Sequence, residues 1–278
     1  MTGTILLTGS TGFVGRQILA ELSRQKIPVR RIIRANYLKK SNEPPRQPGE
    51  VVETPDMFSE SVGWWESACS GIDTIIHSAW YAEPGEYLYS GKNIDCLKGT
   101  LSLAQGAIGS GVRRIVGIGT CLEYDLEPGF LSTTTRLNPL TPYAAAKAAT
   151  YTALSSILGH AGIGFSWCRL FYLYGEGEDP RRLVPYIRNS LKAGKVANLG
   201  TGNQIRDYLN VREAGRMIVE EALGDNIGPK NICSGVPITI RQIAEEIANE
   251  TGNHHLLKFS AVSNNAFDPP KIVGINNE

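Results

Sequence analysis

The sequence has no excess of charge of either sign. Its 28 lysines and arginines stand against 27 aspartates and glutamates, which gives a formal charge of +1. Such a balance creates no sequence-wide field that would attract nucleic acid or an anionic membrane surface. We therefore expect neither as a partner, and a ligand that carries phosphate needs a local binding site.

Long hydrophobic runs and paired cysteines are also missing. No apolar stretch approaches the roughly 20 residues that a membrane-spanning helix needs, and the apolar residues 4–8 lead into a glycine turn where a signal peptide would be cleaved. The cysteines are odd in number and form no Cys-x-x-Cys pair, so neither a disulfide framework nor a metal site is indicated. A reducing, cytoplasmic location fits best. The five cysteines are Cys69, Cys96, Cys121, Cys168 and Cys233.

A regular alternation of short apolar runs with helix-length segments is what the sequence does have. The 278 residues are 42% hydrophobic, enough for a sizeable core, which excludes a disordered or fibrous chain. Runs that are apolar on both faces favour parallel strands covered by helices, and right-handed crossovers then predict a doubly wound parallel α/β sheet of the Rossmann type. The predicted strands lie at residues 4–8, 29–33, 51–53, 73–77, 113–119 and 165–171.

The pattern loosens after Phe171. Helical spacing predicts further helices, the last of which ends on Gly252 as a C-terminal cap, and residues 230–234 favour a strand that returns to the main sheet. We expect a smaller C-terminal substrate-binding cap beside the dinucleotide-binding domain. The predicted helices lie near 183–193, 212–223 and 239–251; the predicted domains are 1–171 with 205–234, and 172–204 with 235–278.

A glycine-rich turn between the first strand and the first helix is the strongest local signal. Glycines at three-residue spacing allow a tight turn and let a pyrophosphate approach the backbone, where unpaired N–H groups at the helix N-terminus favour an anion. The alternative is a plain glycine-rich turn, but the strand before it and the amphipathic helix after it are both present. The predicted cofactor-binding residues are Gly9, Thr11, Gly12, Phe13, Val14 and Gly15.

The end of the second strand lacks the acidic residue that NAD-specific folds usually place against the ribose 2′-hydroxyl. Arg34 stands there instead, with Lys39 and Lys40 close behind. A guanidinium can pair with a 2′-phosphate, so this position favours NADP, with NAD left open. A solvated basic loop is the alternative interpretation. Asp56 and Met57 follow the third strand, where an adenine contact is expected.

Tyr143 and Lys147 are one helical turn apart. The spacing puts a phenol and an ammonium on one helix face, where Lys147 would lower the pKa of Tyr143 and make the phenol a usable acid or base. A bare Tyr-x-x-x-Lys is usually a solvated helix face. Here, however, Thr120 directly follows the fifth strand, at the carboxyl edge of the sheet where ligands bind, and the Tyr143 helix flanks the same edge.

With the glycine turn, Thr120, Tyr143 and Lys147 in this order, the chain resembles the extended short-chain dehydrogenases/reductases. Among these it is most similar to the NAD-dependent epimerase/dehydratase group, whose members act on nucleotide sugars. The resemblance covers nearly the whole length, and it also leaves a homodimer open. Further matching segments are residues 77–79, Asn93, 169–175, 206–208 and 231–235.

The resemblance implies a role for each matching residue. Tyr143 would be the acid/base, Lys147 would hold the nicotinamide ribose, and Thr120 would hydrogen-bond the sugar oxygen at the reacting carbon. Arg206 would clamp the sugar diphosphate. The implied cofactor contacts also include His77 and Ala79, and the implied substrate contacts include Asn93 and Tyr172.

Departures from the family pattern narrow the expected reaction. Sugar 4,6-dehydratases carry a Glu two positions after the Thr, where this chain has Leu122, and Glu123 on an extended loop would point to the other side. The epimerase/reductase that makes GDP-fucose carries a Cys at the position of Leu122, so Cys121, one residue earlier, does not match it. Tyr172 replaces the family's usual Asn, and the family continues some tens of residues past Ile275, so we expect the last helix to be missing.

Because these departures argue against dehydration, the expected reaction is hydride transfer at a single carbon. The leading hypothesis is an NADP-dependent reductase of a nucleotide-linked 4-keto-6-deoxy sugar, because a cofactor that is consumed once per turnover is more often NADPH. A nucleotide-sugar 4-epimerase is the alternative within the family. A sensor or scaffold that binds a dinucleotide without turnover is the alternative from another class. The base, the sugar and the stereochemistry stay open.

Overall fold

The computed structural model describes residues 3–35, 49–260 and 269–276. Its main sheet has seven strands in the order β11-β7-β5-β4-β1-β2-β3, and all neighbouring pairs are parallel. The predicted doubly wound sheet is thereby confirmed, and the strand predicted at 230–234 returns to it as β11. The strands are β1 (Thr4–Thr8), β2 (Val29–Arg34), β3 (Glu50–Thr54), β4 (Ile72–His77), β5 (Arg114–Thr120), β7 (Gly164–Leu170) and β11 (Gly228–Ile232).

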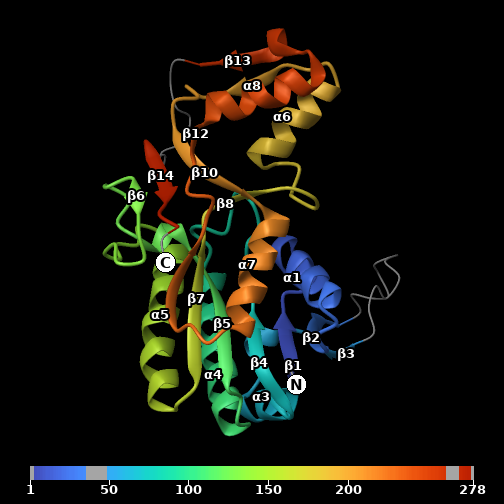
Figure 1. The fold of residues 1–278 in the computed structure, drawn as a ribbon, viewed down its shortest axis with the longest axis vertical. Helices are drawn as coiled ribbons and strands as arrows, with labels where there is room; N and C mark the ends of the chain where they lie inside the picture. Colours follow the sequence, from blue (N-terminus) through green and yellow to red (C-terminus); the bar gives the residue numbers. More distant parts are fainter. Residues whose placement is uncertain (1–2, 36–48, 261–268, 277–278) are drawn as a thin grey trace.

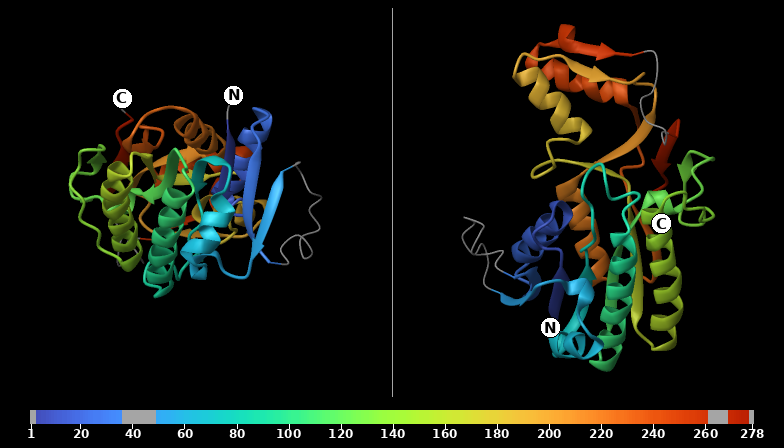
Figure 2. Two further views of the ribbon diagram at one scale, coloured as in Figure 1. Left: turned by 90° about the horizontal axis from the view of Figure 1, so that it is seen from below. Right: turned by 180° about the vertical axis from the view of Figure 1, so that it is seen from behind.

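Helices cover both faces of this sheet (Figure 1), and the view from below in Figure 2 separates the two helical layers. The helices α3, α4 and α5 pack side by side on one face, and α1 packs against α7 on the other. The fold is therefore a three-layer α/β/α arrangement. The bounds are α1 (Phe13–Arg24), α3 (Val62–Cys69), α4 (Lys92–Gly109), α5 (Pro142–His160) and α7 (Val211–Leu223).

The first strand shows why the apolar runs had to be continuous. Leu6 packs into the core cluster under α3, α4 and α5, whereas Ile5 and Leu7 pack into the cluster under α1 and α7. Successive side chains of a strand point to opposite faces, so both sets must be apolar when both faces are covered. All three side chains are buried.

A second, smaller body lies at the upper end of Figure 1, beyond the carboxyl ends of the main strands. Its two helices, α6 (Leu183–Lys192) and α8 (Ile240–Thr251), share an apolar core, and α8 ends on Gly252 in the left-handed conformation as predicted. Its strands are β9 (Ala197–Leu199) with β13 (Leu257–Phe259), and a five-stranded sheet of β12 (Pro237–Thr239), β10 (Ile205–Asn210), β14 (Lys271–Gly274), β6 (Phe130–Leu131) and β8 (Tyr172–Tyr174).

Strand β10 links the two bodies. It pairs with β12 and β14 of the smaller sheet, and it runs directly into α7 of the main body. The predicted division into a dinucleotide-binding domain (1–171 with 205–234) and a cap (172–204 with 235–278) stays a prediction. Within the described ranges, no helix combines the length and the apolar character needed to cross a membrane.

Candidate active site

The carboxyl ends of β1, β4 and β5 meet beside the smaller body. The strand order changes direction between β1 and β4, and ligands of open α/β sheets bind in the crevice at such a point. Thr8, His77 and Thr120 are the last residues of these three strands. All three side chains are buried, so the strand ends are fixed by packing before any ligand arrives.

The glycine turn is a tightly packed backbone turn at the start of α1. Gly9 has a φ of +71°, and a Cβ on Gly15 would overlap the carbonyl oxygen of Gly9. Gly12 caps α1 without a side-chain hydrogen bond. The buried Ser10 Oγ has no hydrogen-bond partner within the described part of the chain. Free N–H groups and a spare hydroxyl at a helix N-terminus fit the pyrophosphate of a dinucleotide.

His77 holds the strand ends together. Its Nδ1 lies 2.9 Å from Thr8 Oγ1 and its Nε2 lies 3.0 Å from Thr100 Oγ1, while Ala79 N donates to Thr8 Oγ1 at 3.2 Å. Burial lowers the pKa of His77 to about 3, so the ring is neutral at physiological pH. Both ring nitrogens are engaged by the protein, which leaves the backbone near Ala79 as the part that a cofactor can approach.

The residues predicted to contact the adenosine half lie along the edge beyond β2 and β3. Arg34 is exposed at the end of β2. The carboxylate of Asp56 caps the short helix η1 (Met57–Ser59) by accepting from Phe58 N and Ser59 Oγ, and Met57 packs against the core. The predicted residues Lys39 and Lys40 lie outside the described residues.

Tyr143 and Lys147 come from the first turns of α5. Thr141 caps the helix and Pro142 occupies its first position, a common helix start. The structure brings Lys147 beneath β5, where its Nζ donates to the carbonyl oxygen of Ile118 at 2.5 Å. Tyr143 lies beside Thr120, whose hydrogen bond acts to lower the phenol pKa. The three predicted catalytic residues are thus neighbours.

Burial dominates the electrostatics of this cluster. It raises the pKa of Tyr143 well above its ordinary value, and it lowers the pKa of Lys147 to about 7. The sequence-based expectation that Lys147 depresses the Tyr143 pKa is therefore wrong for the protein alone. The reason is physical: burial removes the phenolate of Tyr143 from water, and this desolvation is the largest influence on its pKa. Tyr143 is held as a neutral phenol.

Glu123 has a structural role rather than one in the proposed ligand crevice. It lies in the short helix η2 (Cys121–Glu123), not on an extended loop, and it forms a capping box with Thr120. Its carboxylate accepts from Thr120 N at 2.8 Å, from Trp167 Nε1 at 3.0 Å and from Arg169 Nε at 2.7 Å. With every oxygen engaged, this carboxylate is a structural anchor between β5 and β7.

The predicted substrate contacts divide into two groups. Asn93 is buried, and its amide is used locally: Nδ2 donates to Tyr87 O and Ser90 O, and Oδ1 accepts from Trp80 Nε1. Arg206 lies on β10 of the smaller sheet, with its guanidinium carbon 5.5 Å from the ring centre of Tyr172. Asn93 therefore orders the loop 81–90, whereas Arg206 and Tyr172 form a cation–π pair.

Two aromatic residues beside Tyr143 were not predicted. The rings of Trp80 and Tyr87 meet the Tyr143 ring edge-on, at centroid distances of 6.5 and 4.8 Å. Both belong to the segment that follows β4. The sequence could have indicated an aromatic site here, because the segment after β4 also contains Tyr81 and Tyr89.

The loops above the crevice contact each other. Arg181 pairs with Glu83 at 2.7 Å, and the guanidinium carbon of Arg182 lies 5.3 Å from the Tyr87 ring centre. The segment after β4 is thus joined to the segment before α6, across the edge at which Tyr143 lies.

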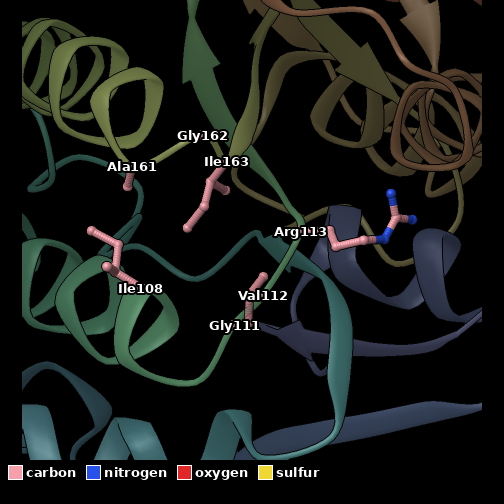
Figure 3. A pocket seen from close by; sticks show the side chains of 7 residues that line it. All are labelled: Ile108, Gly111, Val112, Arg113, Ala161, Gly162 and Ile163. Carbon is pink, nitrogen blue, oxygen red and sulfur yellow. The ribbon is translucent and has the colours of Figure 1, made fainter.

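A shallow hollow lies at the opposite end of the main sheet (Figure 3). Its residues come from the end of α4 and from the connections that lead into β5 and β7, and Arg113 points out of it, where it pairs with Asp73 at 2.6 Å. No acid, base or nucleophile is among the residues that line it, so we do not assign it a ligand. The lining residues are Ile108, Gly111, Val112, Arg113, Ala161, Gly162 and Ile163.

Comparison with known proteins agrees with this architecture. The "NAD dependent epimerase/dehydratase family" model matches residues 5–225. The "dTDP-6-deoxy-L-talose 4-dehydrogenase (NAD(+))" of Aggregatibacter actinomycetemcomitans is 23% identical over 97% of this chain and 98% of its own length.

Two solved structures are similar over almost the whole chain. A UDP-N-acetylglucosamine 4-epimerase from Methanobrevibacter ruminantium has a TM-score of 0.85 at 21% identity, with 98% of this chain and 89% of that one covered. The UDP-glucose 4-epimerase of Thermus thermophilus, in complex with NAD, has a TM-score of 0.81 at 20% identity, with 98% and 90% covered. These likenesses show a shared fold.

The doubly wound sheet and the glycine turn define a Rossmann-type α/β protein. The match over residues 5–225 shows that the chain belongs to the NAD dependent epimerase/dehydratase family. The resemblance inferred from the glycine turn and the Tyr143 and Lys147 pair is thereby confirmed, and the protein is an enzyme of this class. Its relatives are named as nucleotide-sugar epimerases, dehydratases and dehydrogenases.

Proposed function

We propose that the protein reduces the 4-keto group of a nucleotide-linked 4-keto-6-deoxy sugar, using a nicotinamide dinucleotide. The observation that carries this proposal is the cluster of Thr120, Tyr143 and Lys147 at the carboxyl edge of the sheet, with Leu122 where a dehydratase needs an acid. The coarser statement, an NAD-dependent enzyme that modifies nucleotide sugars, follows from its family and relatives.

The protonation state of Tyr143 supports reduction. A reductase needs a proton donor at the sugar oxygen when hydride reaches C4, and a tyrosine phenol, with an ordinary pKa of about 10, is protonated at neutral pH. The Thr120 hydroxyl is close enough to Tyr143 to share a hydrogen bond with the same oxygen. Lys147 would hold the ribose next to the nicotinamide, which fixes the distance between the reacting carbons.

The residues around the glycine turn would hold the dinucleotide. Gly9 and Gly15 let the turn pack tightly against the backbone of Ala79 and of Gly9 itself, which would set the start of α1 against the pyrophosphate, and Ser10 Oγ offers a buried hydroxyl. The cofactor supplies the hydride. NAD is supported by relatives that are named with it or were solved with it. The finer choice of NADP rests on Arg34 at the end of β2 and is part of this proposal.

Replacement of Arg34 by alanine tests the cofactor choice. We expect the unmutated protein to bind NADPH more tightly than NADH, and Arg34→Ala to weaken NADPH binding about tenfold to a hundredfold, because a charged hydrogen bond to the 2′-phosphate is lost. Binding of NADH should not change. Fluorescence titration measures both constants, with the exposed Arg24→Ala as control. Equal affinity of the unmutated protein for the two cofactors would exclude the role of Arg34.

Replacement of Arg206 by alanine tests the substrate anchor. Arg206 is buried, and its guanidinium suits a diphosphate because a planar fork matches phosphate oxygens. We expect Arg206→Ala to raise the KM of the nucleotide sugar at least about tenfold, the loss of one charge-assisted contact. Steady-state kinetics and a melting curve are measured together, with the exposed Arg136→Ala as control. An unchanged KM in a folded variant would make Arg206 a structural residue.

A nucleotide-sugar 4-epimerase is the second candidate, and the names of several similar proteins favour it. In that reaction Tyr143 must first accept a proton, which requires a bound ligand to overcome the high phenol pKa. Absorbance at the nicotinamide band separates the two candidates when CDP-, GDP-, dTDP- and UDP-linked 4-keto-6-deoxyhexoses are supplied with NADPH or NADH. One cofactor oxidised per sugar supports the reductase. Conversion of a nucleotide hexose to its C4 epimer without net oxidation supports the epimerase.

A further inference from the structure

The indole of Trp80 lies between the residues assigned to catalysis. The ammonium of Lys147 stands over its ring, 3.8 Å from the ring centre, and one edge contact joins the ring to Tyr143. The indole N–H donates to Asn93 Oδ1 at 2.8 Å. Asn93 also donates two hydrogen bonds to backbone carbonyls of the loop 81–90, which hold the orientation of the indole ring.

We propose that Trp80 is a positioning residue that holds Lys147 in place as an ammonium through a cation–π contact and so sets the geometry of the Lys147 and Tyr143 pair. The inference rests on the proposed function for what Lys147 does in turnover. The contact between the indole and the ammonium stands on geometry alone. A tryptophan face within about 6 Å is the strongest aromatic partner of a cation.

Lys147 needs such a partner because few charges compensate its burial. The titratable groups that face it are Glu123 from η2, Cys96 from α4 and His77 from β4. His77 is neutral at physiological pH, and burial raises the pKa of the Cys96 thiol, which leaves Glu123 as the one anion among these three. The carboxylate of Glu123 is already shared by Thr120, Trp167 and Arg169.

The Ile118 carbonyl and the Trp80 ring therefore supply the close contacts of the ammonium. Trp167 adds a second ring face, but at 5.6 Å from its centre. Among the described residues the ammonium donates to one carbonyl, which leaves its other N–H groups for hydroxyl groups of a ligand. Trp80 can thus stabilise the charge without consuming a donor.

A double-mutant cycle on the whole protein tests the contact without any substrate. The variants are Trp80→Leu, Lys147→Met and the double substitution, and urea unfolding is measured at pH 5.5 and pH 9. The pKa of Lys147 is lowered from 10.5 to about 7 by burial, so the folded protein carries the charge at pH 5.5 and has lost it at pH 9. A cation–π coupling must therefore appear at the lower pH and vanish at the higher one.

We expect the coupling at pH 5.5 to correspond to a 3- to 30-fold effect on the unfolding constant, about the range of such contacts. Trp80→Leu removes the hydrogen bond to Asn93 whether or not Lys147 is replaced, so the free energy of that bond cancels from the coupling energy. Trp80→Phe keeps a ring face and should keep part of the coupling; it also replaces the leucine variant if that variant does not fold. Coupling that is absent, or equal at both pH values, would overturn the proposal.

Kinetics of the enzyme with its cofactor provide the second measurement. Trp80→Leu should move the alkaline fall of kcat to lower pH by about one unit, because the ammonium loses its partner and one pKa unit is a tenfold change in protonation. The KM for the nucleotide sugar should hardly change, and Trp80→Phe should restore most of the profile. An unshifted profile would contradict the role of Trp80. If no nucleotide sugar is turned over, the proposed function fails, while the unfolding cycle still decides the Trp80 contact.

Discussion

Replacement of Tyr143 by phenylalanine is expected to lower kcat by about 10²–10⁴-fold, the usual contribution of a positioned general acid. The variant loses the phenolic proton beside Thr120, which is present at neutral pH because burial raises the already high phenol pKa. Dinucleotide affinity should stay nearly unchanged, since the glycine turn and Lys147 are intact. Stopped-flow or steady-state absorbance measures the rate, and fluorescence titration measures the affinity.

The matched control for this experiment is Tyr89→Phe. Tyr89 is 66% exposed in the same neighbourhood, so removal of its hydroxyl should leave the rate as it is. Melting curves of both variants exclude a general loss of structure. A Tyr143→Phe enzyme that retains more than about a tenth of the original kcat would be inconsistent with general-acid catalysis by this residue.

Replacement of Glu123 by alanine is expected to lower the free energy of unfolding by about 3–5 kcal/mol, because it leaves the Arg169 guanidinium buried without its partner. Both side chains are at most 1% exposed, and Trp167 Nε1 and Thr120 N lose their acceptor at the same time. Urea unfolding followed by far-ultraviolet circular dichroism gives the change in midpoint. Such a loss is a large part of the stability of an ordinary domain.

The exposed carboxylate of Glu127 provides the control, and Glu127→Ala should change stability by less than about 0.5 kcal/mol. Glu123→Gln keeps an acceptor without the charge, so an intermediate loss is expected. A Glu123→Ala protein as stable as the unmutated one would mean that Arg169 finds another partner or reaches water.

The main sheet could be predicted from the sequence because its signals are local. Runs such as residues 5–7 are apolar at three successive positions, and a strand covered on both faces needs that pattern. The glycine turn was equally readable, since Gly9 and Gly15 have no room for a side chain. The pairing of β10 with β12 and β14 has no comparable local sequence signal, because the whole fold decides which distant strands pair.

The candidate site was predicted in part for the same reason. The Tyr143 and Lys147 spacing is a property of one helix turn, but the value of each pKa depends on burial by β5, η2 and the loop after β4. Trp80 was missed because its contact with Lys147 requires the chain after β4 to fold back on α5, where Tyr143 N donates to Leu88 O. The Thr120 to Glu123 capping box, by contrast, was present in the sequence as Thr-x-x-Glu and could have been recognised.

The direct passage from β10 into α7 has a mechanical consequence. Asn210 is both the last residue of the strand and the cap of the helix, so no linker separates Arg206 in the smaller body from the helix that packs against α1. Gly215 of α7 lies so close to Gln17 of α1 that a side chain there would collide with it. The proposed substrate anchor Arg206 is therefore joined without a linker to the helix pair whose α1 N-terminus is proposed to meet the dinucleotide. Under the proposed function the two sites would be preorganised relative to each other, which would reduce the entropy lost when both ligands bind.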